Sequence, residues 1–127
     1  MHPNEISGII VDAAIKAHSH LGPSLLESVY HHVLAYELPQ RSLSVKSEVD
    51  VPVVYKGLVF DRGFDADLIV ENLVLIEIKS IKELQDVHKK QVLTYLRLTG
   101  LPLGLLINFN VSLLKHRIVR VVNNLDR

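Results

Sequence analysis

The chain carries the sequence FDADLIV at residues 64–70 and, after the three residues ENL, the sequence VLIEIK at residues 74–79. Both segments are apolar and rich in side chains that favour strands, yet four ionisable residues interrupt them. These are Asp65, Asp67, Glu77 and Lys79. Burying an unpaired charge is costly, so strand interiors avoid ionisable residues unless they are paired, hydrated or bound to metal. The four residues are therefore the first candidates for a functional site.

The register between the two predicted strands decides whether these side chains can act together. A two-residue turn places Asp67 and Glu77 on opposite faces, because side chains alternate with period two. A three-residue turn pairs Val70 with Val74 and sets Asp67 opposite Glu77, and Asn72 tolerates the left-handed conformation that such a turn needs. We adopt this second register because it leaves one face of the hairpin wholly apolar. That face comprises Ala66, Leu68, Val70, Val74, Ile76 and Ile78.

The adopted register has a chemical consequence. Carboxylates that face each other on neighbouring strands have Cβ atoms roughly 5 Å apart, which is close enough to share one divalent cation. Such oxygen ligands suit Mg²⁺ or Mn²⁺. Lys79 lies two residues beyond Glu77 on the same face, where it could orient or deprotonate a water molecule or stabilise the charge on a phosphate group.

The rest of the sequence predicts an α/β fold with strands and helices mixed along the chain. Apolar periodicity and the Gly and Pro stops predict helices over Glu5–His20, from Ser24 until Pro39, and over Glu83–Thr99. Apolar and β-branched runs predict strands over Val45–Tyr55, Leu58–Val70, Val74–Lys79, Leu103–Phe109 and Ile118–Val122. The predicted order is α-α-β-β-β-α-β-β, with a central mixed sheet flanked by helices. The first three strands form an antiparallel meander, and the fourth follows a helical crossover.

Composition narrows the class of protein. A chain of 127 residues with 48% hydrophobic residues fits a single domain over residues 1–127. Cysteine is absent, which excludes disulfides, thiolate metal sites and cysteine nucleophiles and favours an intracellular setting. The N-terminus lacks a secretory pattern and no apolar run reaches the ~20 residues of a membrane span. We therefore expect a soluble, cytoplasmic protein that does not contact the membrane.

Charge is balanced overall but divided along the chain. Residues 1–78 contain five Lys or Arg against eleven Asp or Glu, whereas residues 79–127 contain nine against three. This division could place metal-binding carboxylates beside a surface that attracts phosphate, but two hydrated faces that neutralise each other explain it equally well. The cations that could contact a nucleic-acid backbone are Lys82, Lys89, Lys90, Lys115, Arg117 and Arg120.

Asp67 followed by Glu77-Ile78-Lys79 on the next strand resembles the PD-(D/E)xK nuclease superfamily. Nearly the whole chain resembles the GxxExxY branch of that superfamily, through the segments EIS at 5–7, LLESVY at 25–30 and GLLINF at 104–109. The resemblance implies a restriction-endonuclease-like core, a Mg²⁺ or Mn²⁺ cofactor and nucleic acid, with DNA as the expected substrate. The chain departs from the branch pattern at one position, where Ser24 replaces the glycine.

The resemblance also implies a set of site residues. The metal ligands would be Asp67, Glu77, the carbonyl of Ile78 and Glu27, the last from the helix before the sheet. Lys79 would assist the reaction, and Gln91 would position Lys79 or the substrate. Gln91 belongs, with Tyr95, to the Gln-x-x-x-Tyr pattern that often follows this core.

Two of these assignments have structural alternatives. Ser24-Leu25-Leu26-Glu27 also reads as a capping box, in which the Glu27 side chain would bond the backbone N–H of Ser24. Gln91 and Tyr95 lie one helical turn apart and could form a polar pair at the rim of the core.

Three functional hypotheses follow. The first is a metal-dependent nuclease that hydrolyses phosphodiester bonds of DNA. The second is a non-catalytic module that keeps the nuclease fold and binds nucleic acid or protein, which the neutral net charge favours. The third is an enzyme that works only as a homodimer or with a partner protein, through its apolar N-terminal helices.

Overall fold

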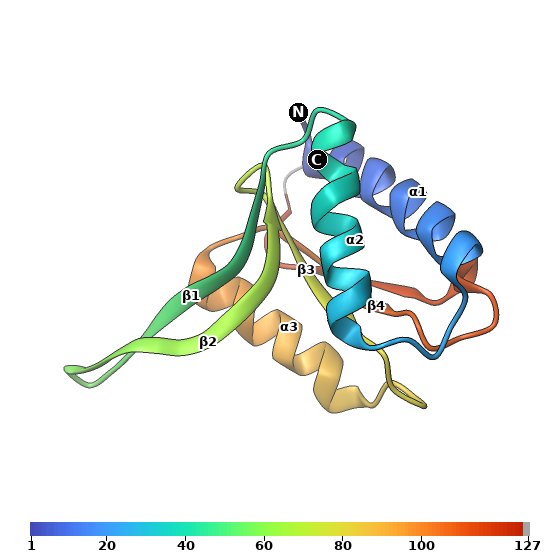
Figure 1. Cartoon of the computed structure of the whole chain (residues 1–127). Coiled ribbons are helices and arrows are strands. Elements are labelled where there is room, and N and C mark those ends of the chain that lie inside the picture. The colour runs from blue at the N-terminus through green and yellow to red at the C-terminus, as the bar shows by residue number, and fades with distance from the viewer. Residues whose placement is uncertain (126–127) are drawn as a thin grey trace.

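A computed structural model of the chain describes residues 1–125 and shows a five-stranded mixed sheet with helices on both faces (Figure 1). The helices are α1 (Pro3–Leu21), α2 (Glu27–Gln40), α3 (Asp86–Thr99) and the short 3-10 helix η1 (Leu114–His116). The strands are β1 (Val45–Tyr55), β2 (Leu58–Val70), β3 (Val74–Lys79), β4 (Leu103–Asn108) and β5 (Ile118–Val122). The predicted mixed α/β architecture and its order of elements are confirmed. None of the described helices is long and apolar enough to cross a membrane.

The strands lie in sequence order across the sheet, from β1 to β5. The first three form the predicted antiparallel meander, β3 and β4 run parallel, and β5 is antiparallel to β4. A parallel pair needs a crossover connection, and α3 provides it. Every residue of β4 is buried, as expected of a strand covered on both faces.

Each face of the sheet has its own hydrophobic core. On one face, α1 and α2 pack against alternate residues of the central strands, in a core that includes Ile10, Leu34 and Ile76. On the other face, α3 packs through Val92 and Leu96 against Ile69, Leu75 and Leu106. The site described below lies on the α3 face, so the position of α3 controls how much of the site is buried.

The turn between β2 and β3 has the predicted register, with Val70 paired to Val74. Both Glu71 and Asn72 have φ near 54°, whereas the sequence indicated a left-handed residue only at Asn72. Two hydrogen bonds to Ser44 hold Glu71 in this conformation: the Glu71 N–H donates to the Ser44 carbonyl at 2.9 Å, and the Ser44 N–H donates to the Glu71 carboxylate at 2.6 Å. Contacts from outside the hairpin thus replace the glycine that such turns usually contain.

Two predicted helix starts are wrong. The second helix begins at Glu27 rather than Ser24, with Leu26 as its N-cap and no side-chain cap, so the capping box of Ser24 and Glu27 does not form. Ser24 instead has φ 77°, a conformation that cannot begin a helix. The third helix begins at Asp86 rather than Glu83. The Gln85 N–H donates to the His88 ring at 2.8 Å, and the His88 N–H donates to the Gln85 carbonyl at 3.0 Å, which fixes the start there.

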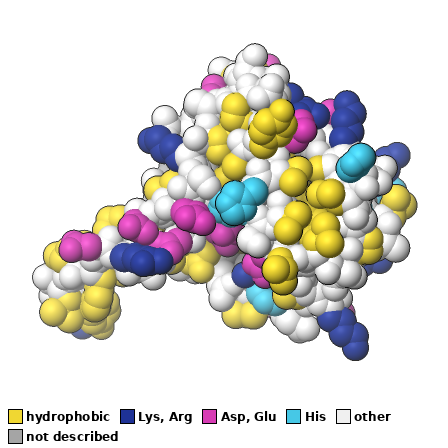
Figure 2. All heavy atoms as spheres, viewed as in Figure 1, with side chains coloured by type: hydrophobic (Ala, Val, Ile, Leu, Met, Phe, Trp, Pro, Cys, Tyr) yellow, Lys and Arg dark blue, Asp and Glu magenta, His cyan; other side chains and the backbone are white. Residues whose placement is uncertain are grey.

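The outer parts of β1 and β2 extend away from the body as a two-stranded arm (Figure 1). Its tip, around Gly57, exposes apolar side chains, and Figure 2 shows them gathered at the end of the arm with acidic groups along its length. The exposed apolar residues of the tip are Val54, Tyr55, Leu58, Val59 and Phe60. These side chains belong to neither hydrophobic core.

Gly104 of β4 allows α3 to approach the sheet closely. A Cβ atom at this position would lie 2.7 Å from Cγ1 of Val92, which no real contact allows, and 3.4 Å from the two methyl groups of Leu96. We predict that Gly104→Ala lowers the free energy of unfolding by about 1–3 kcal/mol, because α3 must move outward. Chemical denaturation of Gly104→Ala, Val92→Ala and the double variant checks this prediction.

In the double variant, the shorter side chain at position 92 makes room for the added methyl group. Its loss of stability should therefore be smaller than the sum of the two single losses. Additive losses would show that the close contact between Gly104 and Val92 does not limit the approach of α3.

Candidate functional site

The ladder of backbone hydrogen bonds between β2 and β3 extends only to the pair Leu68 and Ile76. At the next pair, Asp67 and Glu77, the hydrogen bonds between the strands are accepted by side-chain carboxylates instead of backbone carbonyls. The Asp67 carboxylate accepts a hydrogen bond from the Ile78 N–H at 2.7 Å, and the Glu77 carboxylate accepts one from the Asp67 N–H at 3.4 Å. The two acids thus meet at the fork where β2 leaves β3, in the predicted register.

The strict alternation predicted for β2 fails at this fork. Leu68 packs in the core under α1 and α2, as predicted, but Ala66 packs in the core under α3. β2 therefore twists at Asp67, and the apolar face predicted from Ala66 to Val70 is not continuous. The reason is that the pairing with β3 has ended, so β2 follows β1 into the arm.

Glu77 is the most perturbed acid of the site. Its side chain is buried, with 7% of the residue exposed. Burial raises its pKa from the ordinary 4.5 to about 8, and repulsion from the Asp67 carboxylate adds to the rise, whereas the Asp67 backbone N–H and Lys79 act in the opposite direction. Near pH 7 this carboxyl group therefore holds its proton when no cation is bound.

Two further residues border the acid pair. Lys79, half-buried at the end of β3, lies close enough to lower the Glu77 pKa, although it forms no ion pair among residues 1–125. Tyr95 of α3 stacks on Phe64 of β2 with ring centres 3.8 Å apart. Burial raises the Tyr95 pKa, and the charges of Glu77 and Asp67 raise it further, so its hydroxyl group lies within electrostatic reach of both acids. The contribution of Phe64 was not foreseen, since nothing in the sequence sets this aromatic residue apart from a core residue.

The other residues that the sequence suggested for the site lie apart from the acid pair and its neighbours Lys79 and Tyr95. Gln91 is exposed on α3, and Asp65 pairs with Arg62 rather than with the acids. Glu27 is exposed on the first turn of α2, where it lines a hollow with Ser80 and Asn110. Within residues 1–125, no three His, Asp or Glu side chains are grouped closely enough to bind one metal ion together.

The loop before Glu27 is held by Tyr30. The buried Tyr30 hydroxyl donates to the Gly22 carbonyl at 2.6 Å and accepts from the Leu25 N–H at 3.2 Å, while its ring stacks on Phe109 at 4.4 Å. The loop is also tied to the end of β3, because the Ser80 hydroxyl donates to the Leu25 carbonyl at 2.6 Å. Tyr30 thus fixes the start of α2 relative to the strand that carries Glu77 and Lys79.

The donor groups at the fork fit a divalent cation. Asp67 and Glu77 supply hard oxygen ligands, and the Ile78 carbonyl lies in the strand segment between Glu77 and Lys79. Without a cation, repulsion and burial favour the protonated form of Glu77. A bound cation would remove the repulsion and replace the proton, which is the usual coupling between metal binding and the pKa of a ligand.

Comparison with known proteins gives one result. A family model described as the PD-(D/E)XK nuclease superfamily matches residues 4–121. No curated protein and no solved structure matches the chain significantly. The matched range includes every site residue discussed above.

We predict that Glu77→Gln stabilises the cation-free protein in a pH-dependent way. Because the pKa of Glu77 is raised in the folded state, the wild type loses stability as pH rises from about 4.5 to about 8, and the variant does not. The difference should be negligible near pH 4 and reach about 1–3 kcal/mol above pH 8. Thermal melts across this range with a chelator present measure it. The exposed acid Glu83, changed to Gln, is the matched control and should show no such trend.

We also predict that Ser24→Gly stabilises the protein by about 0.5–1 kcal/mol, because glycine adopts a φ of 77° without the strain that serine carries. The exposed hydrogen bond from the Ser24 hydroxyl to Asn110, at 3.3 Å, offsets little of this gain. Ser28→Gly, within α2, is the control and should destabilise the protein. Equal losses in both variants in denaturation experiments would contradict the prediction.

Proposed function

The chain belongs to the PD-(D/E)XK nuclease superfamily, and from that premise we propose that it is a metal-dependent nuclease that hydrolyses phosphodiester bonds of DNA. The observation that supports this proposal most strongly is the meeting of Asp67 and Glu77 at the fork between β2 and β3. Two acids in contact across a sheet are unfavourable without a ligand, as the raised pKa of Glu77 indicates.

In this proposal, Asp67, Glu77 and the Ile78 carbonyl hold Mg²⁺ or Mn²⁺. Such an ion supplies Lewis acidity: it lowers the pKa of a bound water molecule and neutralises charge on the phosphate group. Glu27 is a further proposed ligand. It lies on the first turn of α2, outside the acid pair, and the bond from Ser80 to Leu25 ties the loop before it to the end of β3.

The remaining residues act on the substrate and on protons. The Lys79 ammonium group, two residues beyond Glu77, donates to the non-bridging oxygens of the phosphate group or orients the attacking water molecule. Gln91, exposed on α3 one turn before Tyr95, positions Lys79 or the nucleic acid. The stacked pair of Phe64 and Tyr95 would limit the access of water to the acids in this proposal, which would strengthen electrostatic interactions at the site.

The proposal predicts that Glu77→Ala, Asp67→Asn and Lys79→Met each lower the rate of DNA cleavage by about 100-fold or more, because each removes a metal ligand or the group that stabilises the phosphate charge. Cleavage of plasmid and of single- and double-stranded oligonucleotides with Mg²⁺ or Mn²⁺ measures this rate. Asp61→Asn, an exposed acid on the same strand as Asp67, is the matched control and should cleave as the wild type does.

Cleavage by Glu77→Ala at the wild-type rate would assign the activity to another site or to a contaminant. Titration of Mn²⁺ by calorimetry supplies a second readout. A folded wild-type protein that neither cuts DNA nor binds Mn²⁺ would refute the proposal and favour the non-catalytic module.

A further inference from the structure

A basic groove lies beside the ends of β3 and β4. It has a volume of about 280 Å³ and is bordered by the loop after β3, the first turns of α3 and the segment from η1 into β5. Its cationic or potentially cationic side chains are Lys82, Lys89, His116 and Arg117, and Glu83 is the one acid that lines it. Leu84 and Val119 supply apolar surface. A second hollow of about 470 Å³ shares Lys82, His116 and Arg117 and extends the groove past Leu113.

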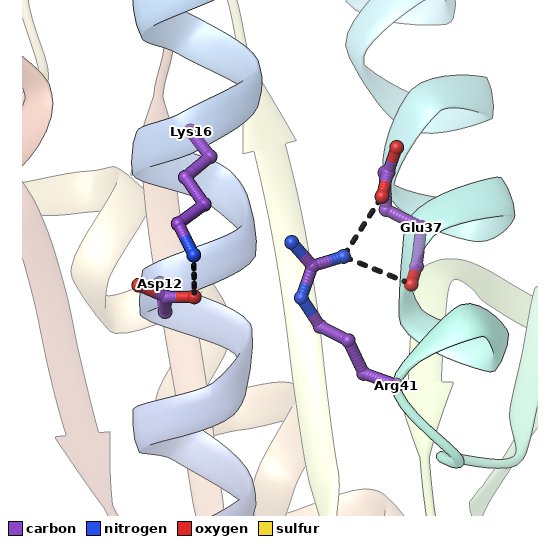
Figure 3. Close-up of polar contacts among 4 residues, drawn as sticks. All are labelled: Asp12, Lys16, Glu37 and Arg41. Atoms are coloured by element: carbon purple, nitrogen blue, oxygen red, sulfur yellow. Dashed lines mark hydrogen bonds and ion pairs between the residues drawn. The ribbon is translucent and has the colours of Figure 1, made fainter.

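The cations of this groove differ from Lys16, Arg41 and Arg62, which form ion pairs. Lys16 on α1 and Arg41, the C-cap of α2, lie on the opposite face of the sheet. Each pairs with an acid four residues earlier, at 3.1 and 2.8 Å (Figure 3). Arg62 on the arm pairs with two acids. In residues 79–125, by contrast, no Lys or Arg forms an ion pair with a described acid. Among the described residues, Lys82, Lys89 and Arg117 of the groove are therefore not engaged in ion pairs.

The groove lies beside β4, the neighbour of the strand that carries Glu77 and Lys79. Asn108 lines the groove and is the β4 partner of Lys79 in the parallel register, so the groove begins about one strand spacing, roughly 5 Å, from the backbone of Lys79. The Asn108 side chain bonds both the N–H and the carbonyl of Ile81, at 3.1 and 2.9 Å. This buried amide holds the loop that carries Lys82 against the end of β4.

We propose that this groove binds the sugar–phosphate backbone of the nucleic-acid strand next to the bond that is cut, an inference that rests on the proposed function. Lys82, Lys89 and Arg117 neutralise successive phosphate groups, and the apolar surface of Leu84 and Val119 contacts sugars. Contacts to phosphate carry no sequence information, so the groove contributes affinity and register rather than base preference. It also explains how a chain with a net charge of zero holds a polyanion.

The test measures binding without cleavage, in the full chain carrying Glu77→Gln with Mg²⁺ present. Fluorescence anisotropy with labelled single- and double-stranded DNA of about 20 nucleotides gives the affinity between about 50 and 200 mM salt. We expect Lys82→Glu/Arg117→Glu to weaken binding about tenfold or more and to reduce the slope of log K against log salt by about 2. Lys89→Glu alone should reduce the slope by about 1.

The matched control is Lys16→Glu/Lys56→Glu, which changes the net charge equally on α1 and at the tip of the arm. The proposal is overturned if this control weakens binding as much as the groove variant, if the groove variant binds within about twofold of its parent, or if the parent does not bind. Thermal melts show whether each variant is folded.

The outcomes also separate this inference from the proposed function. Cleavage that depends on Glu77, with binding unchanged in the groove variant, would overturn the role of the groove and leave the nuclease proposal intact. Binding lost in the groove variant, with no cleavage by the wild type, would overturn the nuclease proposal and keep the groove as the site that binds the nucleic-acid backbone.

Discussion

The structure depends on two hydrogen bonds at the fork between β2 and β3. The Asp67 carboxylate accepts one from the Ile78 N–H, and the Glu77 carboxylate accepts one from the Asp67 N–H. Each carboxylate accepts from a backbone N–H of the opposite strand, so the acids occupy the place where a backbone ladder would otherwise continue. The ladder ends there, and β2 is free to follow β1 into the arm. The close approach of α3 over Gly104 then covers the α3 face of the sheet and contributes to the burial that raises the Glu77 pKa. The end of the β2–β3 ladder, the course of β2 into the arm and the raised pKa of Glu77 thus all depend on this pair of acids.

Much of the framework was predictable from the sequence because buried strands and helix faces show in it as apolar runs and apolar periodicity. The bounds of β1, β2, β3 and β5 agree with the predicted ones, since apolar and β-branched runs are bounded by charged, Asn or Gly residues. The register of the β2–β3 hairpin followed from one requirement, that one face of the hairpin be wholly apolar. That requirement also placed Asp67 opposite Glu77, and hence predicted the centre of the candidate site.

What the sequence did not predict depends on contacts between distant segments. Ser24 was expected to cap a helix, but the bonds from Tyr30 and Ser80 to its loop hold a different conformation. Glu71 adopts a left-handed conformation only because Ser44, distant in sequence, bonds it on both sides. The twist that moves Ala66 to the other core reflects the loss of pairing with β3, which alternation alone cannot show. The positions of Glu27 and Gln91 outside the acid group likewise depend on how α2 and α3 dock against the sheet.

The arm gives one strand two different environments. The inner part of β2 contributes to both cores, whereas the outer part has exposed apolar side chains and pairs only with β1. Regions with few buried contacts open locally at a much smaller free energy than the core, and their amide hydrogens exchange with solvent sooner. We therefore expect the amide hydrogens in the inner part of β2 to exchange slowly and those in its outer part to exchange rapidly. Asp67 lies at the boundary between them, so fraying that begins at the tip must stop there for the acid pair to stay assembled.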